Sequence, residues 1–261
     1  MARDGSQPND RGVEGRTTLS NPPGTLYVVS TPIGHPDDIT LRALATLRHV
    51  TVIASEDPLV TQALLAHHGI TATVTSYGPF QRHEKVLLLL HRLMQGQDVA
   101  LVSDNGTPVI YDPGSLFVAA AYQAGIQVKV IPGPSIISAA PAISGFSGDT
   151  IIFEGNIPST SRRLGQCLSR LRKERRTLVF CVDPGALTGL LKILAQILPT
   201  RQIAVAMNLT TSKETFARGK PGELLDQIGP VPKDSAVTIV IEGYGVGSKN
   251  YSSSRRRMTT R

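Results

Sequence analysis

Apolar residues in the first half of this chain fall into short runs that alternate with longer amphipathic stretches. Five runs rich in β-branched and aliphatic side chains predict buried strands, at residues 25–30, 50–54, 71–75, 99–102 and 128–131. Apolar residues recur at helical spacing after several of these runs, as at Leu41, Leu44 and Leu47 and again through residues 84–94. Strands that alternate with helices predict a mainly parallel sheet with helices on both faces.

The pattern changes beyond the glycine-containing segment 145–148. Strands are predicted there at residues 151–153, 177–181, 203–207, 215–218 and 236–241. Two helices accompany them, one at residues 163–171, where apolar positions recur at i, i+3, i+4 and i+7, and one at the leucine-rich residues 186–198. Because the strands outnumber the helices, this half of the chain predicts a mixed sheet.

Together these elements indicate an α/β protein with two domains. We expect an N-terminal α/β domain at residues 24–133 and a C-terminal α/β domain at residues 149–246, with an interdomain connection at residues 134–148. The polar residues 1–23 and the basic, Ser/Arg-rich residues 247–261 lack periodicity, so we expect both ends to be disordered. Since no apolar run approaches the roughly 20 residues that span a bilayer, and the N-terminus resembles no signal peptide, we expect a cytoplasmic protein without a membrane partner.

Cysteine and histidine usage points away from disulfides and metals. Cys167 and Cys181 are the only cysteines, and both lie in apolar patterns, which predicts buried free thiols in a reducing compartment. The six histidines show no metal-ligand spacing, because the adjacent His67 and His68 cannot share one helix face. We therefore expect no metal site.

The net charge of +7 is unevenly distributed along the chain. The C-terminal residues 247–261 contribute +5, and residues 162–176 contribute +6, whereas the rest of residues 24–246 carries −4. Two interpretations of residues 162–176 stay open: a solvated face of an amphipathic helix, or a patch that contacts phosphates. Aromatic residues make up only 5% of the chain and Trp is absent, so platforms for base stacking are scarce.

Three loops are predicted to follow strands of the first sheet, at residues 31–34, 103–114 and 132–135. In a doubly wound sheet such loops line one crevice, where ligands bind. Residues 103–114 hold two acids, two prolines and two glycines, a composition that lets backbone approach a ligand closely, and Pro113 is expected to open the next helix. Neither a P-loop nor a G-x-G-x-x-G pattern is present, so nucleoside triphosphates and dinucleotides lack their usual signature.

An acidic pair, Glu56 and Asp57, follows the predicted strand at residues 50–54. A carboxylate at the edge of the crevice suits a general base, so both are candidate catalytic residues. Asp57 has an alternative role as the N-cap of the following helix, with Pro58 in its first position. Weaker candidates are His83, Lys213 and Glu214.

Five segments carry a resemblance to a known family: TPIGHPDDITLRAL, SEDPLVT, VALVSDNGTPVIYDPG, IPGPSIISA and FEGNIP. In this order they resemble the signature blocks of the tetrapyrrole methylase superfamily, and most closely those of the ribosomal RNA small subunit methyltransferase I family. The resemblance spans roughly residues 25–243. It implies a two-domain tetrapyrrole methylase-like fold, a homodimer, and S-adenosylmethionine bound between the domains. It also implies methylation of a cytidine ribose 2′-oxygen in small-subunit ribosomal RNA.

The resemblance further implies which positions contact the cofactor. In the first half these are Pro32, Gly34, Asp104, Asn105, Gly106, Thr107, Pro108, Val109, Ser135 and Ile136. In the second half they are Val182, Met207 and Asn208. We expect Asp104 to shape the loop rather than to move protons. No metal is needed, because the leaving group is a neutral thioether.

The chain departs from the family pattern on the acceptor side. The family has Thr-Arg after the acidic pair, where this chain has Pro58-Leu59. A Tyr-Glu-Ala-Pro-His-Arg stretch is replaced by CVDPGA at residues 181–186, and Arg-Glu-Leu-Thr-Lys by MNLTT at residues 207–211. Phosphate contacts dominate RNA affinity, so these losses leave three hypotheses open. They are an RNA ribose methyltransferase, a methyltransferase of a small or tetrapyrrole-like molecule, and a non-catalytic paralogue that binds cofactor or RNA.

Overall fold

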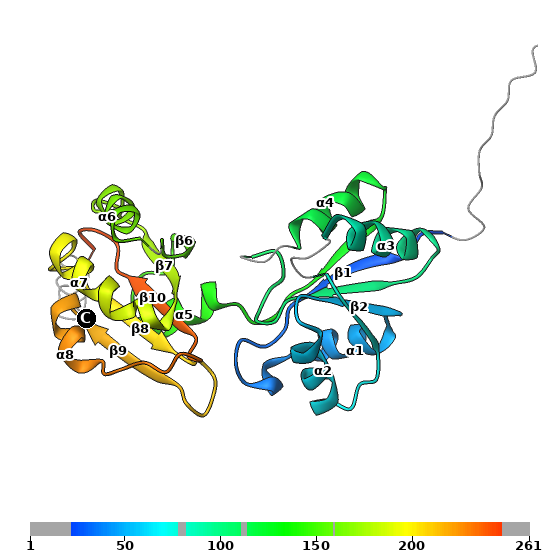
Figure 1. Ribbon diagram of the computed structural model, residues 1–261, viewed down its shortest axis with the longest axis horizontal. Coiled ribbons are helices and arrows are strands. Elements are labelled where there is room, and N and C mark those ends of the chain that lie inside the picture. The colour runs from blue at the N-terminus through cyan, green and yellow to red at the C-terminus, as the bar shows by residue number, and fades with distance from the viewer. Residues whose placement is uncertain (1–21, 78–81, 111–113, 159, 247–261) are drawn as a thin grey trace, which may run out of the picture.

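The computed structural model describes residues 22–77, 82–110, 114–158 and 160–246, which form two lobes (Figure 1). The first lobe contains β1 to β5, and the second lobe contains α5 to β10. The extensions expected to be disordered, residues 1–23 and 247–261, lie almost wholly outside the described residues. No described helix is long and apolar enough to cross a membrane.

The sheet of the first lobe is entirely parallel, as the strand and helix alternation predicts. Its strands are β1 (Thr25–Val29), β2 (Val52–Ser55), β3 (Thr73–Ser76), β4 (Val99–Val102) and β5 (Gln127–Ile131). They lie in the order β3-β2-β4-β1-β5, and every neighbouring pair is parallel. β1 and β4 are therefore neighbours in the sheet, although β2, β3 and the helices between them separate the two strands in the sequence.

Helices cover both faces of this sheet. They are α1 (Leu41–His49), α2 (Pro58–His67), α3 (Arg82–Met94) and α4 (Ser115–Gln123), with a 3-10 turn η1 (Pro36–Asp38) before α1. Leu47 and Leu65 of α1 and α2 pack on one face, whereas Leu93 and Phe117 of α3 and α4 pack on the other. The connections from β1 and β4 thus leave on opposite sides, and this divergence opens a crevice at the carboxyl ends of the two strands.

The sheet of the second lobe is mixed, as predicted. Its strands are β6 (Ile151–Asn156), β7 (Thr177–Val182), β8 (Ile203–Met207), β9 (Thr215–Gly219) and β10 (Val237–Ile241). They lie in the order β6-β7-β10-β8-β9, in which only the β6–β7 pair is parallel. The helices are α5 (Ile136–Ser144), α6 (Ser161–Arg170), α7 (Leu187–Ile197) and α8 (Pro221–Gln227), with a 3-10 turn η2 (Pro184–Ala186). α5 packs on one face, through Ala140, and α6 to α8 pack on the other.

The structure differs from the sequence-based expectation at several helices. Residues 134–148 contain α5, which the interior Pro141 and the unbroken apolar run hide from a periodicity argument. The short α8 also escapes prediction, because seven residues with Gly222 in the first turn carry little helical signal. Leu41, expected in a buried stripe, is 86% exposed, since only Ala43 and Leu47 of α1 are buried. The described part of α4 begins at Ser115, and the predicted start at Pro113 lies outside the described residues.

Both cysteines are less deeply buried than their apolar surroundings predict. Cys167 and Cys181 are free thiols of intermediate exposure. Each lies at the margin of the second sheet's packing, where a cavity reaches the side chain. Burial still raises the pKa of both thiols, so they are protonated near neutral pH.

A buried arginine joins three segments of the second lobe. Arg201 is 7% exposed, and its guanidinium donates to the carbonyl oxygens of Glu242 (2.6 Å), Arg172 (3.2 Å) and Glu174 (3.2 Å). Desolvation lowers its pKa, although the carboxylates of Glu242 and Glu174 oppose the shift. The segment after α6 is therefore held to the ends of β8 and β10 by charge-assisted hydrogen bonds.

We expect Arg201→Leu to destabilise the protein by about 3 kcal/mol, because it removes the donors of three carbonyl groups. The midpoint of thermal unfolding, followed by circular dichroism, should fall by several degrees. Lys192→Leu on the exposed side of α7 is the control and should change stability little. Equal melting temperatures for the two variants would contradict this role of Arg201.

Candidate functional site

A cavity of about 410 Å³ lies between the two lobes, and we call it the cleft. The first lobe lines it with Ile33, Glu56, Ser103, Asp104, Asn105 and Ile110. The second lobe lines it with Ile136, Cys181, Val182, Ser235, Ala236, Val237 and Thr238. Its volume is within the range of small-molecule sites, and it lies at the carboxyl ends of β1 and β4, where the sheet topology opens a crevice.

Backbone hydrogen bonds join the loops that form the first-lobe wall of the cleft. The amide of Thr31 donates to the carbonyl oxygen of Gly106 (2.9 Å), and the amide of Gly106 donates to the carbonyl oxygen of Pro32 (3.2 Å). The hydroxyl of Thr107 donates to the carbonyl oxygen of Pro134 (3.2 Å), which brings in the loop after β5. The three loops expected to line one crevice are therefore in direct contact.

Gly106 fills a position that no other residue fits without strain. Its φ is +81°, in the left-handed region, and a Cβ there would lie 3.2 Å from Cγ2 of Ile33 and 3.4 Å from the carbonyl oxygen of Pro134. The missing side chain thus allows the loops after β1, β4 and β5 to approach one another. A side chain at this position would fill the junction behind the cleft.

Three of the described residues other than glycine have positive φ, and all three lie in loops at this end of the lobes. They are Val109 (75°), Asn208 (51°) and Thr210 (64°). Asn tolerates this conformation, but a β-branched residue such as Val109 or Thr210 does so at a cost on the order of 1–3 kcal/mol. Strain of this kind persists where the surrounding structure fixes it, and it is concentrated at ligand sites.

The two lobes contact each other beside the cleft. The amide of His35 donates to the hydroxyl of Thr210 (2.8 Å). At Gly34, a Cβ would overlap the carbonyl oxygen of Leu209 and lie 2.6 Å from Oγ1 of Thr210. The loop after β1 and the loop after β8 therefore meet backbone to backbone, and they close one edge of the cleft.

The acidic residues of the region have different surroundings. The carboxylate of Asp57 caps α2 by accepting a hydrogen bond from the amide of Leu59 (2.9 Å). Oδ1 of Asp104 accepts one from the amide of Asp57 (3.0 Å), so Asp104 holds the loops after β2 and β4 together. Glu56 follows β2 and lines the cleft itself. The structure shows Asp57 as the N-cap of α2, and the acids that line the cleft are Glu56 and Asp104.

The electrostatics of the cleft favour a ligand that carries positive charge. Its lining residues, all in the described part of the chain, include the acids Glu56 and Asp104 and no Lys or Arg. Isoleucine and valine side chains from both lobes provide apolar surface. The thiol of Cys181 is protonated, because burial raises its pKa, so it is a weak nucleophile and a weak metal ligand.

The structure brings some of the positions expected to contact a cofactor into the cleft and leaves others beside it. Asp104, Asn105, Ile136 and Val182 line the cleft. Pro32 and Gly34 line an adjoining cavity of about 340 Å³ that shares Ser103, Asp104 and Asn105 with the cleft. Gly106, Thr107, Pro108, Val109 and Ser135 line neither cavity, although hydrogen bonds and close packing place Gly106 and Thr107 in the wall behind them.

Met207 and Asn208 are not part of the cleft lining. They line a neighbouring cavity of about 450 Å³ on the second lobe, together with Lys213, and this cavity shares Ser235 with the cleft. Oδ1 of Asn208 nevertheless accepts a hydrogen bond from the amide of Ala236 (2.9 Å), a residue that does line the cleft. Asn208 therefore contacts the site only through the start of β10.

The weaker candidates also lie outside the cleft. The carboxylate of Glu214 accepts a hydrogen bond from the amide of Thr210 (2.6 Å), which supports the strained loop, and His83 lies on α3. Ile33 and Ile110 belong to loops that were expected to line the crevice, but sequence reasoning missed residues 235–238 as lining residues. No motif distinguishes these apolar and small residues from ordinary core positions, and only the packing of the two lobes brings residues 235–238 to the site.

A histidine cluster lies near the mouth of the adjoining cavity. Nε2 of His67 is 2.8 Å from Oδ1 of Asp37, and this hydrogen bond lowers the pKa of Asp37. Nε2 of His68 is 3.0 Å from the carbonyl oxygen of Pro36. Because His68 ends α2 rather than continuing it, the ligand atoms of Asp37, His67 and His68 lie within 4.8 Å of one another. The argument that adjacent histidines cannot converge is therefore wrong here, while the absence of a metal stays a prediction.

Comparison with known proteins places the chain among methylases. A family model described as Tetrapyrrole (Corrin/Porphyrin) Methylases matches residues 25–225. The chain is 37% identical over 220 residues to ribosomal RNA small subunit methyltransferase I of Thermotoga maritima, with 84% of this chain and 99% of that protein covered. It is 36% identical over 230 residues to the protein of the same name from Escherichia coli O157:H7, with 87% and 80% covered.

Solved structures with the same fold include two methyltransferases. Cobalt precorrin-4 methyltransferase, a cobalamin biosynthetic enzyme, gives a TM-score of 0.62 at 21% identity and covers 84% of this chain and 94% of its own. Uroporphyrin-III C-methyltransferase of Thermus thermophilus, complexed with S-adenosylhomocysteine, gives a TM-score of 0.60 at 19% identity and covers 84% and 97%. At these identities the likeness shows the fold.

We expect Gly34→Ala to weaken binding of S-adenosylmethionine, the ligand that the family resemblance implies, by at least tenfold. The new Cβ would overlap the backbone of Leu209, so the lobes must separate at the edge of the cleft. Isothermal titration calorimetry measures the change, and Gly189→Ala, whose Cβ meets nothing within 4 Å, is the control. Unchanged affinity in a folded Gly34→Ala variant would show that the cleft is not the ligand site.

Proposed function

This chain belongs to the tetrapyrrole methylase family, and on that premise we propose that it transfers the methyl group of S-adenosylmethionine to small-subunit ribosomal RNA. The acceptor we propose is the 2′-hydroxyl of a cytidine ribose. The observation that carries the proposal is the match to the Thermotoga maritima relative, which extends over 99% of that protein at 37% identity. A relative matched over its whole length shares both lobes and the cleft between them.

The cleft suits S-adenosylmethionine in size and in charge. A sulfonium is cationic, and the lining contains Glu56 and Asp104 without a Lys or Arg among the described residues. Apolar side chains such as Ile33, Ile136 and Val182 suit an adenine ring, and the absence of a Cβ at Gly106 brings three loops together behind the site. Bound there, the cofactor supplies an electrophilic methyl group and leaves as a neutral thioether, so the chemistry needs no metal.

The residues of this chain have three tasks in such a reaction. The loops after β1, β4 and β5 hold the donor, and the fixed backbone around Gly106 limits its motion, which favours a near-attack arrangement. In this proposal Glu56, which lines the cleft, accepts the proton of the attacking ribose hydroxyl. The His35–Thr210 hydrogen bond joins the two lobes beside the cleft and so helps to hold donor and acceptor together.

The remaining aspects of the proposal concern assembly and location. We propose a homodimer in the cytoplasm, as the family resemblance implies, with the small ribosomal subunit as its partner. The apolar face around Leu87 and Leu88 of α3, both 66% exposed, is one surface that a second copy could cover. Sedimentation measurements of the purified chain test the oligomeric state directly.

Methylation of ribosomal RNA is the decisive test of the function. Mass mapping of small-subunit RNA from cells with and without the gene should show one 2′-O-methylcytidine lost in its absence. Purified protein with S-adenosylmethionine should restore that methyl group on isolated small subunits. An unchanged map, together with cofactor binding, would favour a small or tetrapyrrole-like acceptor instead. No binding of the cofactor at any concentration would favour a non-catalytic paralogue.

We expect Glu56→Gln to reduce kcat for RNA methylation by a factor on the order of 10²–10⁴, because the variant cannot accept the hydroxyl proton. Its affinity for S-adenosylmethionine should fall by less than kcat does, since the amide preserves the size of the side chain and Asp104 keeps a negative charge in the lining. Asp57→Asn is the matched control, because Asn also caps helices well and the wild-type carboxylate serves the cap. If kcat fell further in Asp57→Asn than in Glu56→Gln, Asp57 and not Glu56 would be the general base.

A further inference from the structure

The cleft itself offers RNA almost no electrostatic attraction. Its lining residues, all among those the structure describes, include two acids and no cation. RNA carries one negative charge per nucleotide, and contacts between cations and phosphates dominate its affinity for proteins. An RNA substrate that reaches the cleft must therefore be held by cations elsewhere on the molecule.

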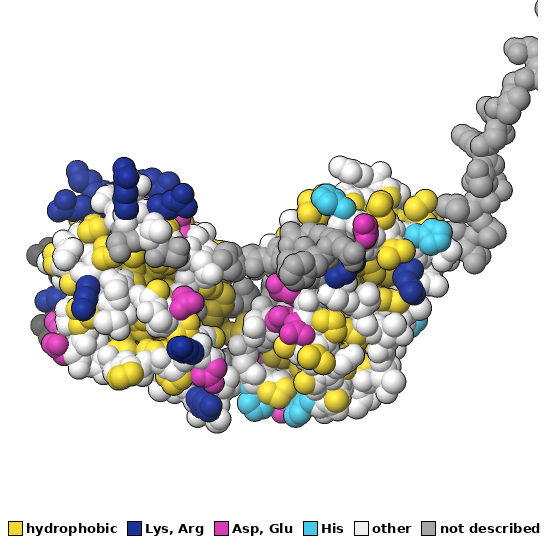
Figure 2. All heavy atoms as spheres, in the orientation of Figure 1, with side chains coloured by type: hydrophobic (Ala, Val, Ile, Leu, Met, Phe, Trp, Pro, Cys, Tyr) yellow, Lys and Arg dark blue, Asp and Glu magenta, His cyan; other side chains and the backbone are white. Residues whose placement is uncertain are grey.

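Seven cations lie together on the second lobe, and we call them the basic patch. They are Arg162, Arg163 and Arg170 of α6, and Arg172, Lys173, Arg175 and Arg176 of the segment that follows it. All seven are exposed. Figure 2 shows dark blue Lys and Arg side chains gathered over the α6 end of the second lobe, with no comparable group on the first lobe in the same view. The rest of residues 24–246 carries −4, so the positive charge of the body is concentrated here.

Most of the basic patch has no ionic partner in the part of the chain that the structure describes. Arg176 pairs with Glu174 through two hydrogen bonds of 2.9 Å, which lower the pKa of Glu174 to about 2. Arg170 lies 3.5 Å from Glu154. The other five cations form no ion pair among the described residues. Their mutual repulsion is uncompensated by the fold, so a polyanionic partner would relieve it.

The position of the charges on α6 does not serve helix stability. Arg162 and Arg163 lie in the first turn, where the helix dipole favours acidic residues, and the first turn contains none. The side chain of Thr160, at the N-cap, makes no capping hydrogen bond. Two cations at this end therefore cost stability, and their presence favours the phosphate-contacting interpretation over a merely solvated helix face.

The segment after α6 is held in a fixed conformation. Arg201 donates to the carbonyl oxygens of Arg172 and Glu174, and the amide of Tyr244 donates to the same carbonyl of Glu174 (2.6 Å). These bonds fix the backbone from which Arg172, Lys173 and Arg175 project. Cations on a fixed backbone lose less entropy on binding than cations on a mobile one.

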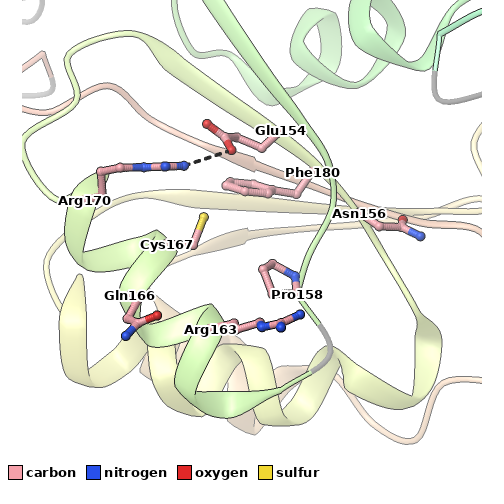
Figure 3. Close-up of a pocket in the computed structure, with 8 residues that line it drawn as sticks. All are labelled: Glu154, Asn156, Pro158, Arg163, Gln166, Cys167, Arg170 and Phe180. Atoms are coloured by element: carbon pink, nitrogen blue, oxygen red, sulfur yellow. Dashed lines mark hydrogen bonds and ion pairs between the residues drawn. The ribbon is translucent and has the colours of Figure 1, made fainter.

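A notch of about 400 Å³ lies beside the basic patch, between α6 and the β6–β7 pair. Its lining residues are Glu154, Asn156, Pro158, Arg163, Gln166, Cys167, Arg170 and Phe180. Figure 3 shows Arg163 and Arg170 on either side, the sulfur of Cys167 pointing between them, and Phe180 behind. The arginines provide phosphate donors, and the amides of Asn156 and Gln166 add neutral hydrogen-bonding groups.

The notch and the cleft lie at the same end of the second sheet. Asn156 of the notch pairs in register with Cys181, which lines the cleft. Phe180 of the notch and Cys181 of the cleft are successive residues of β7, so they point to opposite faces of the sheet. A polynucleotide that crosses the end of β6 and β7 can therefore contact the notch and the cleft at once.

We propose that the basic patch and the notch bind the ribose-phosphate backbone of the substrate RNA, with the notch beside the target nucleotide and residues 172–176, which precede the start of β7, further along the RNA strand. The proposal rests on the proposed function and deepens it, because it assigns substrate recognition to α6 and its following segment instead of to the rim of the cleft. The contacts are to phosphates, so they position the RNA and do not read its sequence.

The test is the triple variant Arg163→Gln, Arg172→Gln and Lys173→Gln. Its control is Arg42→Gln, Lys129→Gln and Lys192→Gln, which removes the same charge from exposed positions elsewhere. Fluorescence anisotropy with a fragment of small-subunit RNA is measured over a range of salt concentrations. The patch variant should bind at least tenfold more weakly at 100 mM salt, and its log–log salt slope should be shallower by about 2. KM for methylation should rise while kcat and cofactor affinity stay close to the wild type.

Equal RNA affinity and equal salt slope for the patch variant and the control would overturn the proposal. Failure of the proposed function has a different signature. In that case the wild type binds S-adenosylmethionine but transfers no methyl group to small subunits, whatever the two triple variants do. Calorimetry with the cofactor also confirms that the patch variant is folded, since the cleft contains none of the three substituted residues.

Discussion

The reciprocal hydrogen bonds between the turns after β1 and β4 determine where this protein can hold a ligand. The amide of Thr31 donates to Gly106 and the amide of Gly106 donates to Pro32 because β1 and β4 are neighbours in a parallel sheet and their connections diverge to opposite faces. The positive φ of Gly106 permits the approach, and the third loop then packs against it through Pro134. The cleft, its acidic lining and its contact with the second lobe all depend on this junction.

The two lobes contribute different chemical groups to the methyltransferase. The first lobe contributes the glycine-containing loops and both acids of the cleft, whereas the second lobe contributes apolar wall residues and nearly all of the concentrated positive charge. Acidic side chains attract a cationic methyl donor, whereas Lys and Arg attract polyanionic RNA. A protein that binds both must therefore keep its acids and its cations apart. The separation of the acidic cleft from the basic patch meets that requirement.

Sequence reasoning succeeded where a signal is local and periodic. It predicted ten strands close to their observed positions, the parallel and mixed sheets, and the meeting of three loops, since β-branched runs and Gly/Pro-rich turns have a direct physical cause. It missed α5, where Pro141 and continuous apolarity remove the helical period, and residues 235–238, which reach the cleft only through packing of the lobes. Met207 and Asn208 were expected to contact the cofactor only because of the family resemblance, and in the structure they line a cavity next to the cleft.

Because α5 packs on the second sheet, it belongs to the second lobe, and the chain that links the two lobes consists only of residues 132–135. Two of these four residues are prolines, and a Cβ on Gly133 would lie 2.9 Å from Cβ of Ser30. The lobes are thus hinged at a single stiff joint, and that joint abuts Ile136 in the wall of the cleft. A ligand that fills the cleft against Ile136 therefore lies beside this joint, and its contacts with both lobes oppose their rotation about it.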